Sequence, residues 1–261
     1  MAKILILETA TEVCSVALSV GGEIVAFEEN GEGARHSELL TLFVEKVLAG
    51  AAMKASDLNA VCVSRGPGSY TGLRIGVSAA KGLCYALQIP LLAVSTLNAM
   101  AAHAVDIVAS SASITASSGT DITSAGDDNV PPGSVTAFPG KPEYPLLCPM
   151  LDARRMEVYT ALFDTRGNQI SDISAMIICK DSFQTELDRG KVFFFGNGAP
   201  KCRGVITHPN ARFIDDFHAS ARFMSLLAQE RFDNEVFESV PYFEPFYLKD
   251  FIATIPKNKV I

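Results

Sequence analysis

The sequence predicts an α/β protein built from two related lobes, each a mixed β-sheet with helices. One order of elements begins at Lys3 and returns at Leu146: a buried strand, a hairpin and, later, a strand that ends in a glycine-rich turn. The two turns are similar, Gly66-Pro67-Gly68 in the first half and Gly196-Asn197-Gly198 in the second. Repeated order with weak residue identity indicates a duplication of one α/β unit.

We place the lobe boundaries at residues 1–98 and 99–261. Residues 110–144 are rich in Ser, Thr, Gly, Asp and Pro and have almost no large apolar side chain. Such a segment buries too little to offset its ordering entropy, so we interpret it as a flexible insertion. A late helix at 219–232 and an aromatic tail at 241–251 are expected to pack back on the N-terminal lobe.

Apolar patterning assigns the first elements. Gly21-Gly22 separates two strand-like runs and favours a two-residue hairpin. Apolar residues spaced by three and four between Leu39 and Leu48 predict a helix, with Ser37 as its N-cap and Gly50 as its end. The strands expected here are 3–8, 14–20 and 23–27.

The later elements follow from the same reasoning. Strands are expected at 59–64, 90–94, 146–151, 156–163, from Gln169 onward and at 192–195. Helices are expected at 73–87 and 97–108.

Composition limits the classes of protein. The net charge of −7 argues against a protein that grips nucleic acid alone, because phosphate binding needs a basic face. No run of about 18 apolar residues exists, and the first residues lack the order of a signal peptide, so we expect a cytoplasmic protein. The six cysteines form no C-x-x-C pair, and those inside apolar runs are interpreted as buried thiols.

The turn from Arg65 to Gly76 is the sharpest local motif. A glycine-rich turn before a helix can hold an anion with backbone N–H groups. A phosphate loop needs lysine after its last glycine, and here Leu73 follows Gly72. We therefore favour a plain strand-to-helix turn that needs positive φ and is capped by Ser69 or Thr71, with a phosphate site as the alternative.

Small residues recur every four positions along the helix behind this turn, at Gly72, Gly76 and Ala80. Glycine lowers helix stability by about 1 kcal/mol relative to alanine, so a close-packed neighbour is expected. That neighbour is either another part of this chain or a partner protein, and the pattern leaves both open.

Residues that would carry chemistry are sparse. The four histidines form no H-E-x-x-H, and no G-x-S-x-G frames a nucleophile, although a site assembled from distant residues stays open. The turns at Glu8-Thr-Ala-Thr11 and Asp152-Ala-Arg-Arg155 lack the small glycines of a phosphate-holding hairpin. Asp152 is expected to pair with Arg154 or Arg155, or to face a partner.

Together these motifs resemble the TsaB family, also called YeaZ, over nearly the whole chain except about 110–144. The segments that carry the resemblance are Glu8-Thr-Ala-Thr, Cys14-Ser-Val-Ala-Leu, Arg35-His-Ser-Glu-Leu-Leu, Gly66-Pro-Gly-Ser-Tyr-Thr-Gly-Leu-Arg-Ile-Gly, Lys81-Gly-Leu, Val94-Ser-Thr-Leu, Asp152-Ala-Arg-Arg-Met-Glu-Val-Tyr, Gly196-Asn-Gly-Ala and Pro245-Phe-Tyr-Leu-Lys.

The resemblance implies a two-lobed actin-like ATPase fold of the ASKHA, ribonuclease H-like class. It implies a non-catalytic scaffold or activator in the bacterial complex that makes N6-threonylcarbamoyladenosine (t6A) at position 37 of ANN-decoding tRNAs. The partners implied are the catalytic subunit TsaD, which forms a heterodimer, and TsaE. It further implies a homodimer in isolation and contact with tRNA only through the complex.

The same resemblance assigns residues. The partner contact uses the first two helices, here represented by His36, Leu39, Leu40, Phe43, Val47, Gly72, Gly76, Ala80 and Leu83. A vestigial or shared nucleotide site would comprise Glu8, Thr9, Thr11, Asp152 and Arg154. No catalytic residue, metal or cofactor is expected for the chain alone, and a nucleotide at the interface with TsaD is left open.

Two other functions are weighed against this one. The first is an ATP-binding small-molecule kinase or hydrolase of the same fold, which predicts ATP binding to the isolated chain. The second is a glycoprotease-like metallopeptidase, which the sequence disfavours.

Overall fold

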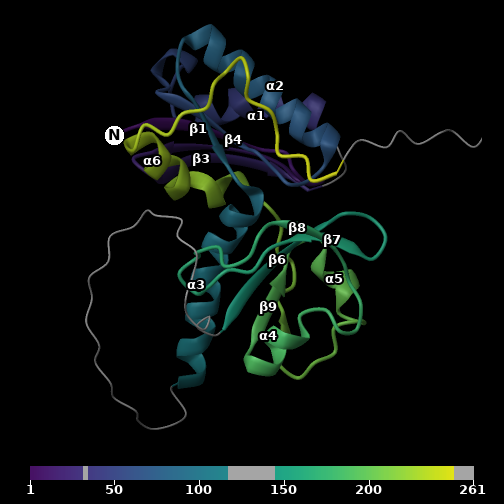
Figure 1. Ribbon diagram of the computed structural model, residues 1–261. Coiled ribbons are helices and arrows are strands. Elements are labelled where there is room, and N and C mark those ends of the chain that lie inside the picture. Colours follow the sequence, from purple (N-terminus) through teal and green to yellow (C-terminus); the bar gives the residue numbers. More distant parts are fainter. Residues whose placement is uncertain (32–34, 117–144, 250–261) are drawn as a thin grey trace, which may run out of the picture.

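The computed structural model describes residues 1–31, 35–116 and 145–249 of the chain (Figure 1). The expected insertion at 110–144 begins too early, because the helix α3 (Thr96–Ala116) continues through its first seven positions. The rest of that expectation lies outside the described residues.

The N-terminal lobe contains a five-stranded mixed sheet in the order β3-β2-β1-β4-β5. β1, β2 and β3 form an antiparallel meander, and β4 and β5 continue from β1 in parallel. Gly21 and Gly22 have φ of 61° and 88°, which confirms the predicted hairpin turn. The strands are β1 (Lys3–Glu8), β2 (Cys14–Val20), β3 (Glu23–Asn30), β4 (Ala60–Ser64) and β5 (Leu91–Val94).

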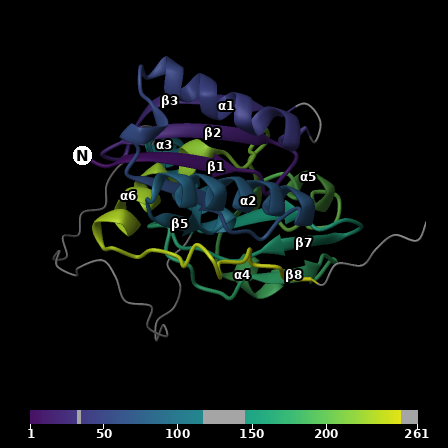
Figure 2. The same cartoon turned by 90° about the horizontal axis from the view of Figure 1, so that it is seen from above.

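Two helices, α1 (His36–Gly50) and α2 (Tyr70–Leu87), cover one face of this sheet (Figures 1 and 2). Their apolar faces and the sheet enclose a common core, which explains the three- and four-residue spacing. The predicted cap Ser37 is wrong: α1 begins at His36, and Arg35 holds the cap position without a side-chain bond. A single 3₁₀ turn, η1 (Ala55–Asp57), precedes β4.

The C-terminal lobe repeats the arrangement with the sheet order β8-β7-β6-β9-β10. β6, β7 and β8 are antiparallel neighbours, whereas β9 and β10 extend the sheet in parallel from β6. Order and direction match the first sheet strand for strand, so the predicted duplication and the two-lobed α/β class are confirmed. The strands are β6 (Leu146–Asp152), β7 (Glu157–Thr160), β8 (Ser174–Ile177), β9 (Val192–Phe195) and β10 (Ala211–Phe213).

The predicted strand at Gln169 is wrong. Gln169 makes only an isolated bridge to Phe163, and β8 begins at Ser174. An Asp164 turn with Gly167 at φ 82° reverses the chain here, so the ladder with β7 starts later than the apolar pattern suggested. The short helices α4 (Gln184–Arg189) and α5 (Ala199–Cys202) lie on the outer face of this sheet (Figure 1).

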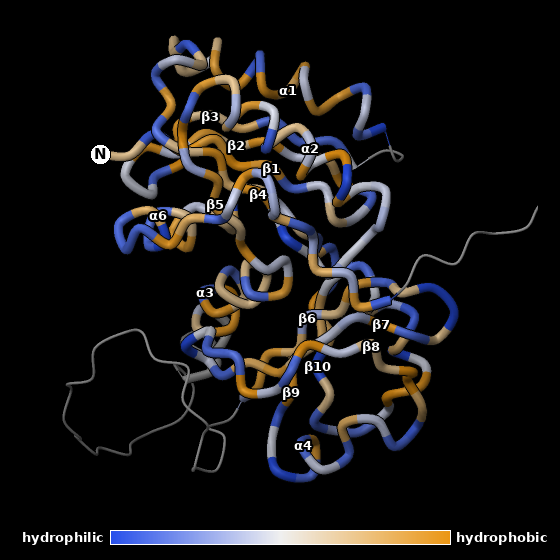
Figure 3. The backbone as a smooth tube through the Cα atoms, turned by 45° about the horizontal axis from the view of Figure 1, so that its top comes forward, coloured by the Kyte–Doolittle hydropathy of each residue, from blue (hydrophilic) through white to orange (hydrophobic). Residues whose placement is uncertain are grey.

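Between the two sheets lie α3, the 3₁₀ turn η2 (Ala221–Met224) and α6 (Ser225–Asp233) (Figure 1). The single late helix expected at 219–232 is thus two elements. η2 and α6 close the inner core of the N-terminal sheet, and α3 closes that of the C-terminal sheet. Apolar residues concentrate in the central strands of both sheets (Figure 3).

The chain end returns to the N-terminal lobe. α6 contacts β1, β3 and β5, and Phe243 is buried in the core beneath α1 and α2. The Lys81 ammonium on α2 donates to the carbonyl oxygens of Pro241 and Phe243 at 3.0 and 3.2 Å. The segment after α6 therefore runs along α2 toward the junction of the lobes (Figure 2).

None of the described helices has the length and apolar character needed to cross a bilayer.

Candidate functional site

A cleft of about 950 Å³ lies between the two lobes. Two hairpin turns face each other across it: the β1–β2 turn with the start of α2 from the first lobe, and the β6–β7 turn from the second. The end of the described tail, Tyr247 to Lys249, lines its rim. Ligands commonly bind at such junctions between α/β units, so this cleft is the candidate site.

The glycine-rich turn forms the N-terminal wall by close packing. Gly66 has φ 101°, which confirms that the turn needs a left-handed residue. Methyl groups at Gly68 and Gly72 would come well inside 3.0 Å of the backbone oxygens of Ala10 and Thr9. The Ser69 N–H donates to the Ala10 carbonyl at 2.6 Å, and its hydroxyl caps α2 by accepting from the Gly72 N–H at 3.2 Å. Because Gly68 and Gly72 have no side chain, the β1–β2 turn of the same chain packs directly against them.

The small-residue face of α2 has the same explanation. A methyl group at Gly76 would overlap the Thr9 hydroxyl, and Ala80 is fully buried. Of the two readings that the sequence left open, packing within the chain is the one observed. Gly72, Gly76 and Ala80 are thus buried within the isolated chain, and their contact with a partner stays a prediction.

The α1 residues assigned to a partner contact are also mostly internal. Four of them are buried in the isolated chain, and their role in a partner contact stays a prediction: His36, Leu40, Phe43 and Val47. Leu39 and Leu83 are partly buried and pack on the same core. On α1 and α2, the large apolar side chains that reach the surface are Leu42, 51% exposed, and Tyr85, 76% exposed.

Glu8 is a buried carboxyl at the end of β1, behind the cleft wall. The Ser64 hydroxyl and the Ala10 N–H donate to its Oε1 at 2.9 and 2.6 Å, and its Oε2 has no partner among the described residues. Burial raises the pKa of this carboxyl from 4.5 to about 7, while the bonds from Ala10, Ser64 and Thr9 oppose the shift. Glu8 is thus a protonated core group through the acidic range.

This burial predicts how stability depends on pH. The folded chain keeps the Glu8 proton up to about pH 7, whereas the unfolded chain loses it near 4.5, so stability falls as pH rises between these values. Glu8→Gln mimics the protonated form and removes the dependence. Urea unfolding at pH 5 and pH 8 is expected to show the variant gaining about 3 kcal/mol relative to wild type at the higher pH.

Glu45→Gln, exposed on α1, controls for the change in net charge. An equal gain in that variant, or the same difference between Glu8→Gln and wild type at both pH values, would contradict the assignment.

The residues proposed for a nucleotide site are only partly brought together. Thr11, Asp152 and Arg154 line the cleft, but Glu8 and Thr9 do not, because their side chains point into the protein core. The Thr11 hydroxyl accepts from the Val13 N–H at 3.2 Å and so shapes its own turn.

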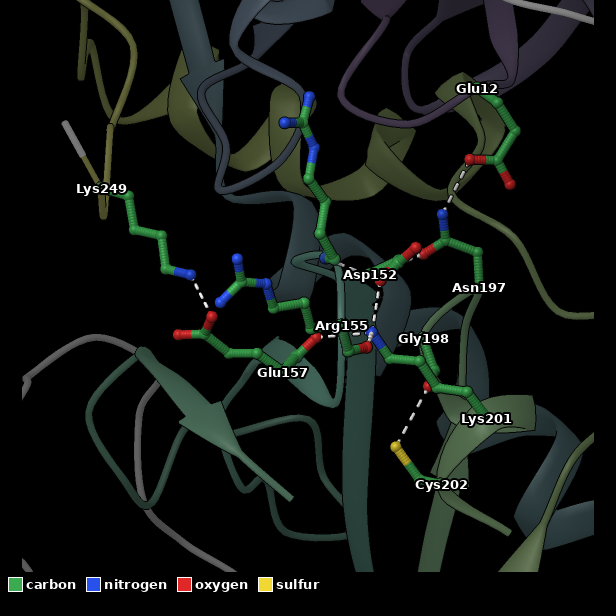
Figure 4. Close-up of polar contacts among 10 residues, drawn as sticks. Glu12, Asp152, Arg155, Glu157, Asn197, Gly198, Lys201, Cys202 and Lys249 are labelled. Atoms are coloured by element: carbon green, nitrogen blue, oxygen red, sulfur yellow. Dashed lines mark hydrogen bonds and ion pairs between the residues drawn. The ribbon is translucent and has the colours of Figure 1, made fainter. Parts of the chain in front are cut away.

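The C-terminal wall is a tight turn made by two arginines. Arg154 and Arg155 both have positive φ, 67° and 48°, a strained conformation for side-chain-bearing residues. The Lys201 ammonium on α5 donates to the carbonyl oxygens of Arg155 and Glu157 at 2.8 and 2.7 Å and forms an ion pair with Asp152 (Figure 4). These contacts of Lys201 stabilise the conformation of the β6–β7 turn.

The expected hydrogen-bonded pair of Asp152 and Arg154 forms, through the Arg154 backbone and not through its side chain. Asp152 accepts from the backbone N–H of Arg154 at 2.9 Å, and its cationic partner is Lys201. Lys201 lies 49 residues away and reaches Asp152 because α5 follows the second glycine turn, so no local pattern could identify it.

Polar contacts cross the cleft at both ends. The Asn197 amide donates to Glu12 at 2.8 Å and accepts from the Asp152 N–H at 3.0 Å, which joins the two hairpin turns (Figure 4). At the other end Lys249 of the tail pairs with Glu157 on β7. These contacts hold Glu12, Asp152 and Glu157, the acidic residues that line the cleft.

The chemistry available in the cleft is limited. Within residues 1–31, 35–116 and 145–249 no group of three or more His, Cys, Asp or Glu side chains is placed to hold a metal ion. The His36 imidazole, which lines the cleft, contacts the Val13 carbonyl at 3.3 Å. Ser69, the nearest hydroxyl of the glycine turn, caps α2. His36 and Ser69 therefore both make contacts that support the local structure.

Known sequences resemble parts of this chain. A family model described as TsaD, tRNA N6-adenosine threonylcarbamoyltransferase, matches residues 32–120. The chain is similar to the tRNA threonylcarbamoyladenosine biosynthesis protein TsaB of Escherichia coli, 40% identical over 38% of this chain and 42% of that protein. It is similar to the Bacillus subtilis protein of the same name, 28% identical over 65% of this chain and 58% of the relative. The matches thus span about half the length of these relatives.

Comparison with solved structures covers more of the chain. YeaZ from Pseudomonas aeruginosa superposes with a TM-score of 0.65 at 24% identity, over 95% of this chain and all of that one. A Pseudomonas aeruginosa protein described as similar to peptidase YEAZ reaches a TM-score of 0.70 with the same identity and coverage. These likenesses show a shared fold, and with the sequence matches they confirm the resemblance to TsaB and YeaZ.

Proposed function

We propose, from the resemblance of this chain to the TsaB proteins, that it serves in the biosynthesis of t6A in tRNA as a non-catalytic subunit. In this proposal it forms a heterodimer with TsaD, works with TsaE and meets tRNA only inside their cytoplasmic complex. The observation that carries the proposal is the 40% identity to the Escherichia coli protein named for t6A biosynthesis.

The geometry of the cleft supports a non-catalytic role. In an ATP-using two-lobed fold the two hairpin turns hold phosphate groups. Here Arg154 and Arg155 occupy the second turn. The glycines that follow β4 pack against Thr9 and Ala10. The acidic side chains that line the cleft are engaged with Asn197, Lys201 and Lys249.

The partner surface is proposed on the outer faces of α1 and α2. Exposed apolar residues on one side of a lobe are typical of a contact with another protein, and Leu42 and Tyr85 meet that condition. Leu39 and Leu83 would form the partly buried border of the same surface. In isolation the chain would cover this surface by forming a homodimer.

The direct test is binding. We expect the purified chain to co-purify with TsaD and to form a stoichiometric heterodimer by analytical ultracentrifugation. TsaE is expected to join only when both proteins are present. A mixture in which this chain and TsaD sediment independently at micromolar concentration would overturn the proposal.

A second candidate is an ATP-binding kinase or hydrolase of the same fold, because the cleft of about 950 Å³ is large enough for a nucleotide. Calorimetry of the isolated chain with millimolar ATP and Mg²⁺ separates the candidates. The subunit proposal predicts no heat of binding, and saturable binding followed by turnover would favour the enzyme.

A further inference from the structure

A second hollow, of about 300 Å³, lies at the junction of the lobes and does not belong to the cleft described above. Its wall comes from three parts of the chain. Arg65 and Ser95 directly follow the parallel strands β4 and β5, Arg231 stands on α6, and Gln169 with Ile173 belongs to the C-terminal lobe. Ligands in open α/β sheets bind outside the carboxyl ends of parallel strands, which is where this hollow lies.

The charged side chains that line this hollow are all positive. Arg65 and Arg231 line the hollow, and no Asp or Glu is among the described residues that do. Neither guanidinium has a hydrogen bond or an ion pair to a described residue. Two partly buried guanidinium groups with no counter-charge are unusual in a chain of net charge −7. An anion in the hollow would supply that charge.

Asn98 adds a third donor. Asn98 lines the hollow and carries an N–H₂ group that can donate, while its carboxamide oxygen is buried without a partner among the described residues. The Ser95 hydroxyl, on the same wall, is only 3.5 Å from the Asn98 N–H and remains able to donate. The described polar side chains of the wall thus offer mainly donors, as a site for an oxyanion requires.

We propose that this hollow binds the phosphate group of a small molecule, with Arg65 and Arg231 as its charged ligands and Asn98 and Ser95 as neutral donors. Arginine binds phosphate in a fixed bidentate geometry, and two arginines match the two charges of a phosphomonoester. A volume of about 300 Å³ is at the lower limit of ligand cavities, which favours a small metabolite over a nucleic acid.

The proposed site lies where three segments of the chain meet. The N-terminal lobe supplies Arg65, α6 supplies Arg231, and the C-terminal lobe closes the hollow with Gln169 and Ile173. A bound phosphate would therefore join three segments that lie far apart in the sequence and stabilise the arrangement of the lobes. The inference does not rest on the proposed role in t6A synthesis.

The test is calorimetric titration of the full chain with inorganic phosphate, glycerol 3-phosphate and malonate at matched ionic strength, together with thermal unfolding in each anion. We expect both phosphate compounds to bind and to raise the melting temperature, and malonate to bind more weakly. Arg65→Gln and Arg231→Gln are each expected to weaken phosphate binding by about tenfold or more. Arg189→Gln, exposed at the end of α4, is the matched control and should bind like wild type.

Circular dichroism confirms that each glutamine variant is folded before the titration. Phosphate binding that is unchanged in both Arg65→Gln and Arg231→Gln would overturn the site, as would no binding to the wild-type chain. Malonate binding as tight as phosphate would overturn the phosphate assignment. Binding of RNA that is lost in Arg231→Gln, without binding of either phosphate compound, would overturn the small-molecule assignment.

Discussion

Gly72→Ala is expected to lower the free energy of unfolding by about 4 kcal/mol, a large effect for one methyl group. The added carbon would come well inside 3.0 Å of the Thr9 carbonyl oxygen, which belongs to backbone and has no rotamer to change. The β1–β2 turn or the start of α2 must then shift, and the Ser69 cap at the same helix end would be disturbed. Urea unfolding followed by circular dichroism measures the loss.

Gly82→Ala is the matched control on the same helix. No atom lies within 4 Å of the methyl group that it adds, and the residue is exposed. Alanine is the better helix former, so this variant should gain up to about 1 kcal/mol. Equal behaviour of the two variants would show that α2 does not pack on the β1–β2 turn as described.

Leu42→Glu and Tyr85→Glu are expected to weaken binding to TsaD by about tenfold or more each, because a charge would enter an apolar contact. Both side chains are exposed in the isolated chain, so stability should stay within about 0.5 kcal/mol of wild type. Surface-immobilised TsaD and a concentration series of each variant give the affinities.

Ile177→Glu provides the comparison for that experiment. Ile177 is 73% exposed on β8 of the C-terminal lobe. It should bind TsaD like wild type. Loss of affinity in Ile177→Glu, with full affinity in the Leu42 and Tyr85 variants, would move the interface to the other lobe.

A substitution at Gly76 cannot show whether α1 and α2 contact TsaD, although Gly76 lies on α2. A larger side chain there would displace Thr9 inside the same chain, so lost binding would report unfolding. The pattern of small residues predicted a close neighbour correctly. The identity of that neighbour depends on a turn more than 60 positions earlier, which helical spacing does not encode.

The repeat could be predicted from the sequence because both lobes need a glycine with positive φ at the same point of the fold. Gly66 and Gly196 have φ of 101° and 103°, and each ends the fourth strand of its sheet. The shared order of elements along the chain indicated that repeat, whereas the order of strands within each sheet came from the structure. Ser37 failed as a cap because α1 begins one residue earlier, at His36, whose buried ring contacts Val13. Long-range tertiary packing decided the helix boundary against local propensity.

The polar framework of the cleft was the least predictable part. Lys201 and Asn197 reach Asp152 and Glu12 through the second glycine turn, and Lys249 reaches Glu157 from the tail. Each pair joins segments that are distant in sequence, and surface charges offer many equivalent partners. Only the fold selects among them.

The central claim is that this chain is required by the t6A machinery but performs none of its chemistry alone. The most direct measurement is reconstitution of tRNA modification with TsaD, TsaE and a threonylcarbamoyl donor, with t6A measured by mass spectrometry of tRNA nucleosides. We predict that t6A forms only when this chain is added, that Leu42→Glu with Tyr85→Glu removes the stimulation, and that the chain alone produces none. Equal t6A formation without the chain would contradict the claim.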